Sequence, residues 1–175
     1  MADAEHRVIV RACRADELAE VLDLWRTVHR AAGETDDPRG LSALRELDAS
    51  ALLVAELDGR IVGSLIAAWD GWRGNMYRLT VLPDLWRQGI ATRLVAAGDA
   101  HLEARGARRI SALVREEDER VRRFWLFAGY EHDEGTGRYV KTITERGGRS
   151  RAPAGVASSR SRASRPPDYV PDGPV

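Results

Sequence analysis

Three strand-like segments follow one another through the middle of the chain, joined by turns too short for a crossover. Leu52–Leu57 and Ile61–Trp69 flank Asp58-Gly59, and Asn75–Leu82 follows the turn Asp70–Gly74. Asp-Gly between two apolar runs favours a tight hairpin, whereas parallel neighbours need a connection of about a dozen residues or more. The segments therefore predict an antiparallel meander.

Helices and strands alternate on both sides of this meander. Apolar positions at the helical period predict one helix that Asp16 can cap and that runs to about Arg30, and another over Gly89–Arg105. The apolar stripe of the second helix is Ile90, Leu94, Val95, Gly98 and Leu102, and Gly106 ends it. The other predicted elements are strands at His6–Ala12, Arg108–Val114, Tyr130–His132 and Arg138–Ile143, and helices at Pro38–Asp48 and Glu117–Ala128.

The order of these elements predicts an α/β fold. A meander followed by a β–α–β unit gives a mixed, mostly antiparallel sheet with one parallel pair and helices on both faces. The length of 175 residues, with 43% apolar, suits one core, which we assign to residues 1–145. Residues 146–175 lack Leu, Ile, Phe and Trp and carry 6 of the 27 basic residues, a composition typical of a disordered tail.

Composition excludes several classes of function. The formal net charge is zero, which argues against a general nucleic-acid binder or a polybasic membrane-surface protein. No apolar run of about 18 residues offers a transmembrane helix, and the first residues lack the apolar stretch of a secretory leader. Cys13 is the single cysteine, so we expect no disulfide framework and no cysteine-based zinc site, and the cytoplasm is the default compartment. The four histidines show no ligand spacing, so no metal is expected.

The segment from Val81 to Val95 is the most informative about function. A strand ends at Pro83, a short loop follows, and Gly89 opens a helix whose first backbone N–H groups are free to bind an anion. Gly89 and Ala91 are small enough for a phosphate to approach the backbone, and Thr92 adds a hydroxyl. An ordinary strand-to-helix turn with one glycine remains the alternative interpretation.

This segment resembles motif A of the GNAT superfamily of acetyl-coenzyme A-dependent N-acetyltransferases. The pattern V-x-P-x-x-[RQ]-x-x-G-x-[GA] reads VLPDLWRQGIA from Val81 to Ala91. The downstream FWLFAGYEHD, from Phe124 to Asp133, is similar to motif B. The turn Asp70–Gly74 is similar to that of the small bacterial YpeA-like branch.

The resemblance implies roles for particular residues. Backbone groups of Leu79 and Val81 would pair with the pantetheine arm, where the parallel neighbour strand splays away, and a backbone N–H near Val81 would polarise the thioester carbonyl. Trp125 stands where many members place the tyrosine that protonates the leaving thiolate, which implies a place against the cofactor. The pyrophosphate would be bound by the backbone of Arg87, Gln88, Gly89, Ile90, Ala91 and Thr92.

The usual acid and base are not visible in the sequence. An indole such as that of Trp125 is not a useful acid, and Trp86 and Leu113 also depart from the family pattern. Among the alternatives, Glu34, Asp36 and Asp37 lie in the loop that lines the acceptor side in this family, and Tyr130 could act as an acid. Asp70 and Tyr77 are further candidates. For each of these residues, an ordinary structural role is the competing interpretation.

The function implied is transfer of an acetyl group from acetyl-CoA to a primary amine, either of a small molecule or of a protein. A non-catalytic acyl-CoA-binding sensor or interaction module is the main alternative. A generic phosphate-binding α/β protein is disfavoured by the meander. Members of the superfamily often dimerise, so the resemblance leaves a homodimer open. No nucleic acid, membrane or metal partner is expected.

Deleting residues 146–175 should leave folding intact, because this segment offers no large apolar side chains to a core. We expect the melting temperature to change by less than about 2 °C. Thermal unfolding of the full-length and shortened proteins, followed by circular dichroism, tests this expectation. A large cooperative loss of stability would show that the segment docks on the rest of the chain.

Overall fold

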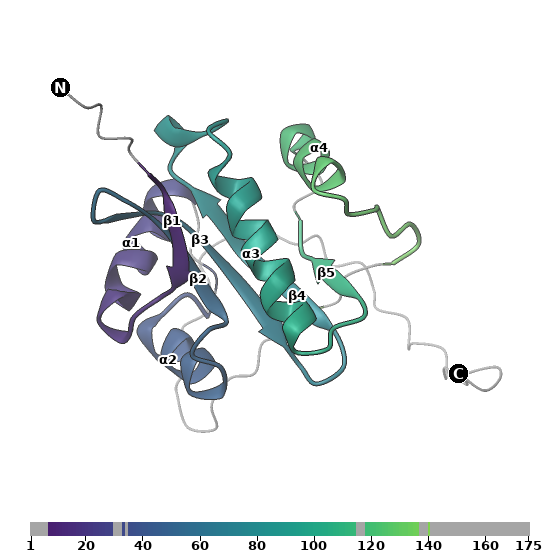
Figure 1. Cartoon of the computed structure of the whole chain (residues 1–175), viewed down its shortest axis with the longest axis horizontal. Helices are drawn as coiled ribbons and strands as arrows, with labels where there is room; N and C mark the ends of the chain where they lie inside the picture. Colours follow the sequence, from purple (N-terminus) through teal and green to yellow (C-terminus); the bar gives the residue numbers. More distant parts are fainter. Residues whose placement is uncertain (1–6, 30–32, 34, 115–117, 137–139, 141–175) are drawn as a thin grey trace, which may run out of the picture. The chain divides into compact units, whose positions relative to one another are not determined.

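The computed structural model of the chain describes residues 7–29, 33, 35–114, 118–136 and 140. Within them, five strands form one mixed sheet in the order β1-β2-β3-β4-β5 (Figure 1). The first four strands pair antiparallel, and β4 pairs parallel with β5. The strands are β1 Ile9–Ala12, β2 Leu52–Leu57, β3 Arg60–Trp69, β4 Gly74–Val81 and β5 Ile110–Ala112. This arrangement confirms the predicted mixed α/β fold.

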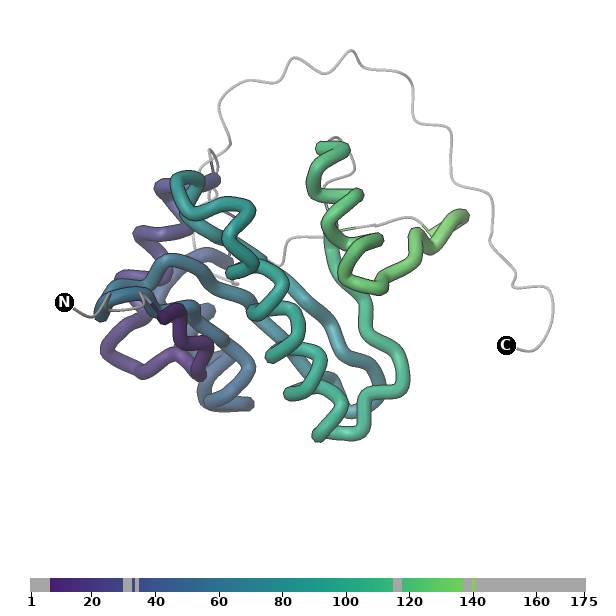
Figure 2. Tube along the Cα trace, turned by 45° about the horizontal axis from the view of Figure 1, so that its top comes forward, coloured from purple at the N-terminus to yellow at the C-terminus, as the bar shows by residue number. Residues whose placement is uncertain are grey.

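Helices cover both faces of the sheet, as predicted (Figures 1 and 2). Alternate residues of β2 show how: Leu52 and Val54 pack with α1 and α2, whereas Leu53 and Ala55 pack with α3. This is why β2 is apolar along most of its length. The helices are α1 Leu18–Val28, α2 Pro38–Leu47, α3 Ile90–Ala104 and α4 Glu119–Phe127, and short 3-10 turns lie at Ala15–Glu17 and Pro83–Leu85.

All of these elements belong to one compact unit, Met1–Asp133, and Glu134–Val175 forms a second. The predicted domain boundary at residue 145 and the predicted tail lie outside the described residues and stay predictions.

The meander and α3 follow their sequence signals closely. Asp58 and Gly59 both have positive φ, 51° and 78°, as a tight hairpin turn requires. The predicted apolar stripe of α3 is its buried face. A Cβ atom at Gly98 would lie 2.8 Å from Leu65 and 2.9 Å from Met76, so the glycine lets α3 pack directly on the sheet.

Two predicted details are wrong. Asp16 does not cap a helix: it lies inside the 3-10 turn before α1, where the Glu17 carboxylate instead accepts the N–H of Arg14 at 2.8 Å. Residues 130–132 form no strand, because Gly129 adopts φ 91° and the Tyr130 N–H donates to the carbonyl of Trp125 at 3.0 Å, closing the end of α4. The expected partner strand, residues 138–143, lies outside the described residues except for Val140.

An ion pair fastens the start of α1 to the sheet. The guanidinium of Arg11 on β1 contacts Glu17 at 2.6 Å and also pairs with Glu56 on β2. Glu17 is only 7% exposed. The hydrogen bond from Arg11 lowers the pKa of Glu17 from 4.5 to about 2, against the opposing effect of burial.

This pair makes stability depend on pH. Because the folded-state pKa of Glu17 lies below its unfolded value, its contribution is complete above about pH 4.5 and is lost as pH falls towards 2. We expect Glu17→Gln to lower the free energy of unfolding at pH 7 by about 2–3 kcal/mol. The variant should also lose less of its stability than wild type as the pH falls below 4.5. Urea unfolding from pH 7 to 3 measures both effects. Asp16→Asn, at an exposed neighbour, is the control; equal pH curves for wild type and Glu17→Gln would contradict the assignment.

Candidate active site

A one-residue insertion in β4 organises the centre of the site. Ser64 pairs with Thr80 and Ile66 pairs with Tyr77, so Arg78 and Leu79 together stand opposite the single residue between Ser64 and Ile66. This is a β-bulge. Arg78 takes φ 53°, a left-handed conformation that is uncommon for a residue other than glycine.

The bulge changes which peptide groups of β4 face β5. Before it, the Gly74 N–H donates to the Arg109 carbonyl at 3.0 Å and the Met76 carbonyl accepts the Leu113 N–H at 3.3 Å, from the residues that flank β5. After it, the Leu82 N–H donates to the carbonyl of Val62, in β3, at 2.9 Å. Because successive peptide groups alternate in direction along a strand, Leu79 and Val81 face the β5 side instead.

The pairing between the two parallel strands, β4 and β5, ends just before the bulge. The register of β4 with β5 runs from Gly74↔Ile110 to Met76↔Ala112, and β4 continues beyond it to Val81. Within the described residues, β4 therefore continues beyond its pairing with β5, as expected of the splayed pair that the resemblance implied. Leu79 and Val81 lie in this part of β4 and stay the predicted partners of an extended ligand.

The loop after β4 presents the start of α3. Arg87 and Gly89 have positive φ, 64° and 77°, and Gly89 is the N-cap residue of α3 with no side chain capping the helix. The first N–H groups of the helix lack partners within it, and no atom lies within 4 Å of the place where a Cβ of Gly89 would be. This end of α3 can receive an anion.

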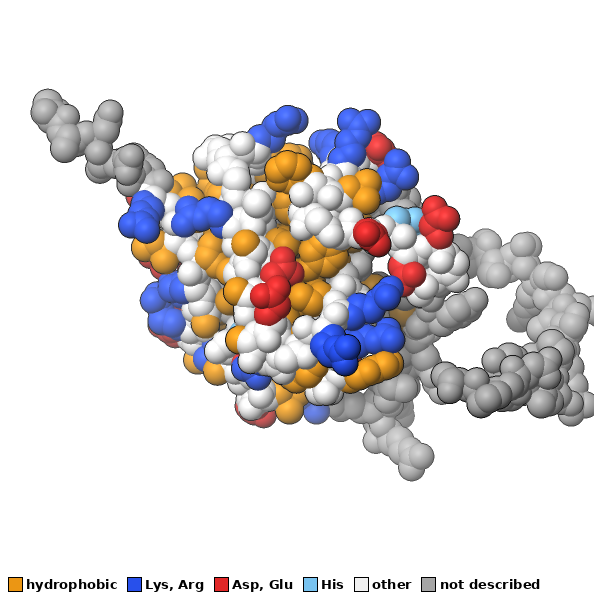
Figure 3. Space-filling view, turned by 45° about the vertical axis from the view of Figure 1, so that its right-hand side comes forward, with side chains coloured by type: hydrophobic (Ala, Val, Ile, Leu, Met, Phe, Trp, Pro, Cys, Tyr) orange, Lys and Arg blue, Asp and Glu red, His pale blue; other side chains and the backbone are white. Residues whose placement is uncertain are grey.

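Trp86 links this loop to both β4 and α4. Its indole N–H donates to the Val81 carbonyl at 2.8 Å, which fixes the orientation of that peptide group. The guanidinium of Arg120, in the first turn of α4, lies 5.5 Å from the Trp86 ring centroid and pairs with Asp118 at 3.0 Å. Figure 3 shows basic side chains gathered at the end of this face where α3 and α4 begin.

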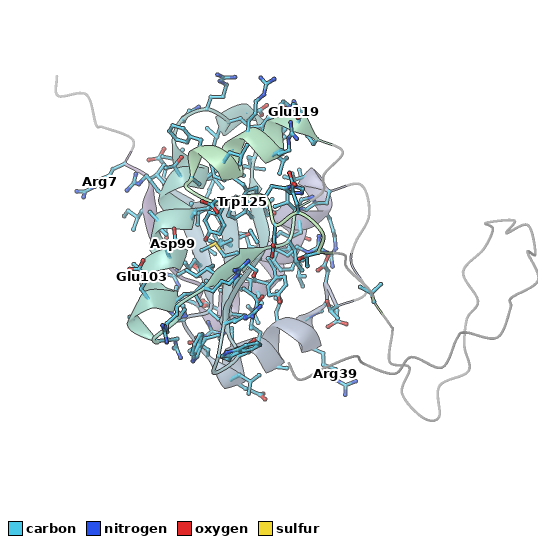
Figure 4. All side chains as sticks on the ribbon, turned by 90° about the vertical axis from the view of Figure 1, so that its right-hand side faces the viewer. Arg7, Arg39, Asp99, Glu103, Glu119 and Trp125 are labelled. Carbon is cyan, nitrogen blue, oxygen red and sulfur yellow. The ribbon has the colours of Figure 1, made fainter. Side chains whose placement is uncertain are left out.

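Trp125 and Tyr130 lie in the packed layer between α4, α3 and the sheet. Trp125 is 8% exposed and meets the ring of Tyr130 edge-on at 4.8 Å. The Tyr130 hydroxyl donates to the Asp99 carboxylate of α3 at 2.7 Å (Figure 4 labels Trp125 and Asp99). Burial and this bond to Asp99 raise the pKa of Tyr130 far above its usual value of 10, so the hydroxyl is a poor proton donor.

Three of the candidate acidic residues make structural contacts. Asp37 accepts the N–H of Gly40 at 2.6 Å and caps α2. Asp70 accepts two amide N–H groups within its turn, and these bonds lower its pKa. Asp36 is buried against Arg78, and Glu34 lies outside the described residues.

No sequence pattern indicated a role for His29. Its Nε2 lies 2.9 Å from the Thr80 hydroxyl, on the α1 side of β4 beside the bulge. The contact joins residues 51 positions apart in the chain, so no local pattern could have shown it.

The comparisons with known proteins agree with this geometry. Residues 18–130 match the acetyltransferase (GNAT) family. The chain belongs to this family. Acetyltransferase ECA0875 of Pectobacterium atrosepticum is 35% identical over 112 residues, which are 64% of this chain and 79% of that protein.

Solved structures share the fold. An aminoglycoside N-acetyltransferase AAC(6')-Iy in complex with CoA has a TM-score of 0.63 at 18% identity, over 83% of this chain and 99% of that one. Ard1 from Thermoplasma volcanium has a TM-score of 0.63 at 15% identity, over 70% of this chain and 81% of that one. The protein is therefore an acetyltransferase with the GNAT fold, and the expected family and enzyme class are confirmed.

Two further observations concern metal ions and membrane-spanning helices. Among the described residues, no group of three or more His, Cys, Asp or Glu side chains could hold a metal ion. In the same part of the chain, no helix has the length and apolarity needed to cross a membrane.

The geometry at Tyr130 generates a prediction. Tyr130→Phe should keep the turnover number within about threefold of wild type, because the hydroxyl is bound to Asp99 and is not available as an acid. Steady-state release of thiol from acetyl-CoA measures this. Trp125→Phe, which alters the same aromatic cluster without touching the hydroxyl, is the control. A loss of 100-fold or more for Tyr130→Phe alone would make Tyr130 the acid after all.

Proposed function

We propose that the protein transfers the acetyl group of acetyl-CoA to a primary amine. The observation that carries the proposal is that the bulged end of β4, at Leu79 and Val81, continues beyond its pairing with β5 and leads to the start of α3 at Gly89, where no side chain caps the helix. An extended thioester arm ending in a diphosphate needs both features side by side.

The phosphate end of the ligand fits the loop of this chain. With open space at Gly89 and no acidic residue in the first turn of α3, a diphosphate can approach the backbone N–H groups of residues 87–92. The positive end of the helix dipole adds to the attraction. Acetyl-CoA would supply the activated acetyl group.

The thioester end fits the edge of β4. Leu79 would hydrogen-bond the amide groups of the arm, as one strand pairs with another. The Val81 N–H would donate to the thioester carbonyl and stabilise the negative charge that develops on its oxygen during transfer. The indole of Trp86 donates to the Val81 carbonyl at 2.8 Å, which restrains the next peptide group, directly after this N–H.

The acceptor is proposed as an amine because the family joins acetyl groups to amines. A solved structure of the same fold holds a bisubstrate analogue, CoA-S-monomethyl-acetylneamine, at 18% identity to this chain. Such a likeness supports the fold alone, so aminoglycosides enter only as members of a test panel, together with amino acids, polyamines and peptides. Glu34 stays a candidate for attracting a cationic amine to the acceptor side, whereas the carboxylate of Asp37 is already used to cap α2.

Binding of acetyl-CoA should raise the melting temperature, because a ligand that binds only the folded protein stabilises it by about 2.7 kcal/mol at 100 times its Kd. Gly89→Glu should abolish the rise, since it sets a carboxylate against the phosphates. Gly106→Glu is a matched control: Gly106 also has positive φ, 90°, with open space at its Cβ position, but at the other end of α3.

Thermal shift measurements with 1 mM acetyl-CoA, followed by thiol release across the amine panel, test the proposal. We expect a rise for wild type and Gly106→Glu only, and thiol release that depends on the amine. No rise for wild type would refute cofactor binding. Binding without thiol release for any amine would instead favour a module that binds acyl-CoA without turnover.

A further inference from the structure

Arg78 holds the strained position of the β4 bulge with a side chain that reaches the α1 side of the sheet. There its guanidinium pairs with the carboxylate of Asp36, from the loop between α1 and α2. The Nε of Arg78 donates to Asp36 at 3.0 Å, and the side chain of Asp36 is 7% exposed. The charge of each residue is thus neutralised by the other in a largely buried place.

The loop is shaped around this guanidinium. Asp36 also accepts the backbone N–H of Gly33 at 2.6 Å. A Cβ atom at Gly33 would collide with the guanidinium of Arg78, so a larger residue there would displace the end of the arginine side chain from its place beside Asp36. The ion pair therefore links two residues that lie 42 positions apart in the chain, and the bond from Gly33 holds the carboxylate of Asp36 in place for it.

The backbone carbonyl of Arg78 is held in place as well. It accepts hydrogen bonds from the hydroxyls of Thr80 at 3.2 Å and Ser64 at 3.4 Å, both of which are buried. The indole of Trp25 donates to Ser64 at 2.7 Å and lies 5.5 Å below the Arg78 guanidinium. Side chain and carbonyl of the one bulged residue are both fixed from the α1 side.

We propose that the Asp36–Arg78 ion pair is a positioning element of acetyl transfer, which holds the bulge so that Leu79 and Val81 face the opening between β4 and β5. This inference rests on the proposed function. Neither residue touches the reacting atoms. Without the pair, Arg78 can leave its left-handed conformation, and the peptide groups of Leu79 and Val81 then lose their direction towards the opening.

The pair also gives Asp36 a role different from attracting the acceptor amine. A carboxylate that is buried and neutralised by a guanidinium presents little charge to a cation. Its substitution should therefore affect turnover with neutral and cationic amines alike. Asp37, one residue further on, is exposed and caps α2, which makes it the natural comparison.

Asp36→Asn should lower kcat by about 10- to 100-fold, because small displacements of reacting groups reduce rates by that order. The Kd of acetyl-CoA should stay within about twofold of wild type, since the phosphate loop is unchanged. Asp37→Asn should leave kcat within about threefold. Initial rates over both substrate concentrations, with cofactor affinity by calorimetry, give the split between kcat and binding.

Substitutions of Arg78 separate the ion pair from the backbone conformation. Glycine accepts φ 53° without strain, so Arg78→Gly removes the pair and keeps the conformation accessible. We expect Arg78→Gly to be at least as stable as Arg78→Ala and yet to lose kcat as Asp36→Asn does. Added ethylguanidinium should restore part of the kcat of Arg78→Gly, and should leave Asp36→Asn unchanged.

A readout independent of activity keeps the two proposals distinct. In ¹H–¹⁵N spectra, the amide signals of Leu79 and Val81 should shift in Asp36→Asn and stay in place in Asp37→Asn. Unshifted signals, or a wild-type kcat in folded Asp36→Asn, would overturn the positioning role. If wild-type protein transfers acetyl to no amine, the proposed function fails, and the amide signals still decide whether the pair holds the bulge.

Discussion

The extra residue in β4 is the constraint on which the rest of the site depends. In a regular strand the peptide groups alternate strictly, so a strand that bonds β5 at Gly74 and Met76 would turn the backbone of Leu79 and Val81 towards β3. One inserted residue reverses that alternation. The strand can then pair with β5 along its first half and offer a free edge along its second half, without leaving the sheet.

The two ends of this free edge are fixed by different neighbours. At the bulge, Asp36, Ser64 and Thr80 hold Arg78 from the α1 side. At the far end, the indole of Trp86 binds the Val81 carbonyl, and the chain then turns through two left-handed residues into α3. The close packing of α3 on the sheet at Gly98 fixes the helix against the strands. Core packing thus holds the loop that we propose to bind the phosphates next to the end of β4.

The sequence predicted those parts of the fold that local pattern controls. The hairpin at Asp58-Gly59, the buried stripe of α3 and the uncapped glycine at its start are all readable from neighbouring residues. The bulge was missed because an arginine, and not a glycine, takes the left-handed conformation at residue 78. Its stabilising partner Asp36 lies 42 residues away. The strand expected at residues 130–132 failed for a related reason, because the end of α4 captures the Tyr130 N–H.

The polar groups that the sequence suggests as acids and bases make structural hydrogen bonds and ion pairs in the folded protein. Asp37 caps a helix, Asp70 closes a turn, Asp36 neutralises an arginine, and the Tyr130 hydroxyl is bound to Asp99. Catalysis by these residues would compete with the bonds they already make. Placing an amine against a polarised thioester can by itself contribute about 7–11 kcal/mol in favourable cases. The rate of such an enzyme depends first on how accurately the backbone of β4 places the thioester. The residues that hold that part of β4 therefore affect the rate even at a distance from the reacting atoms.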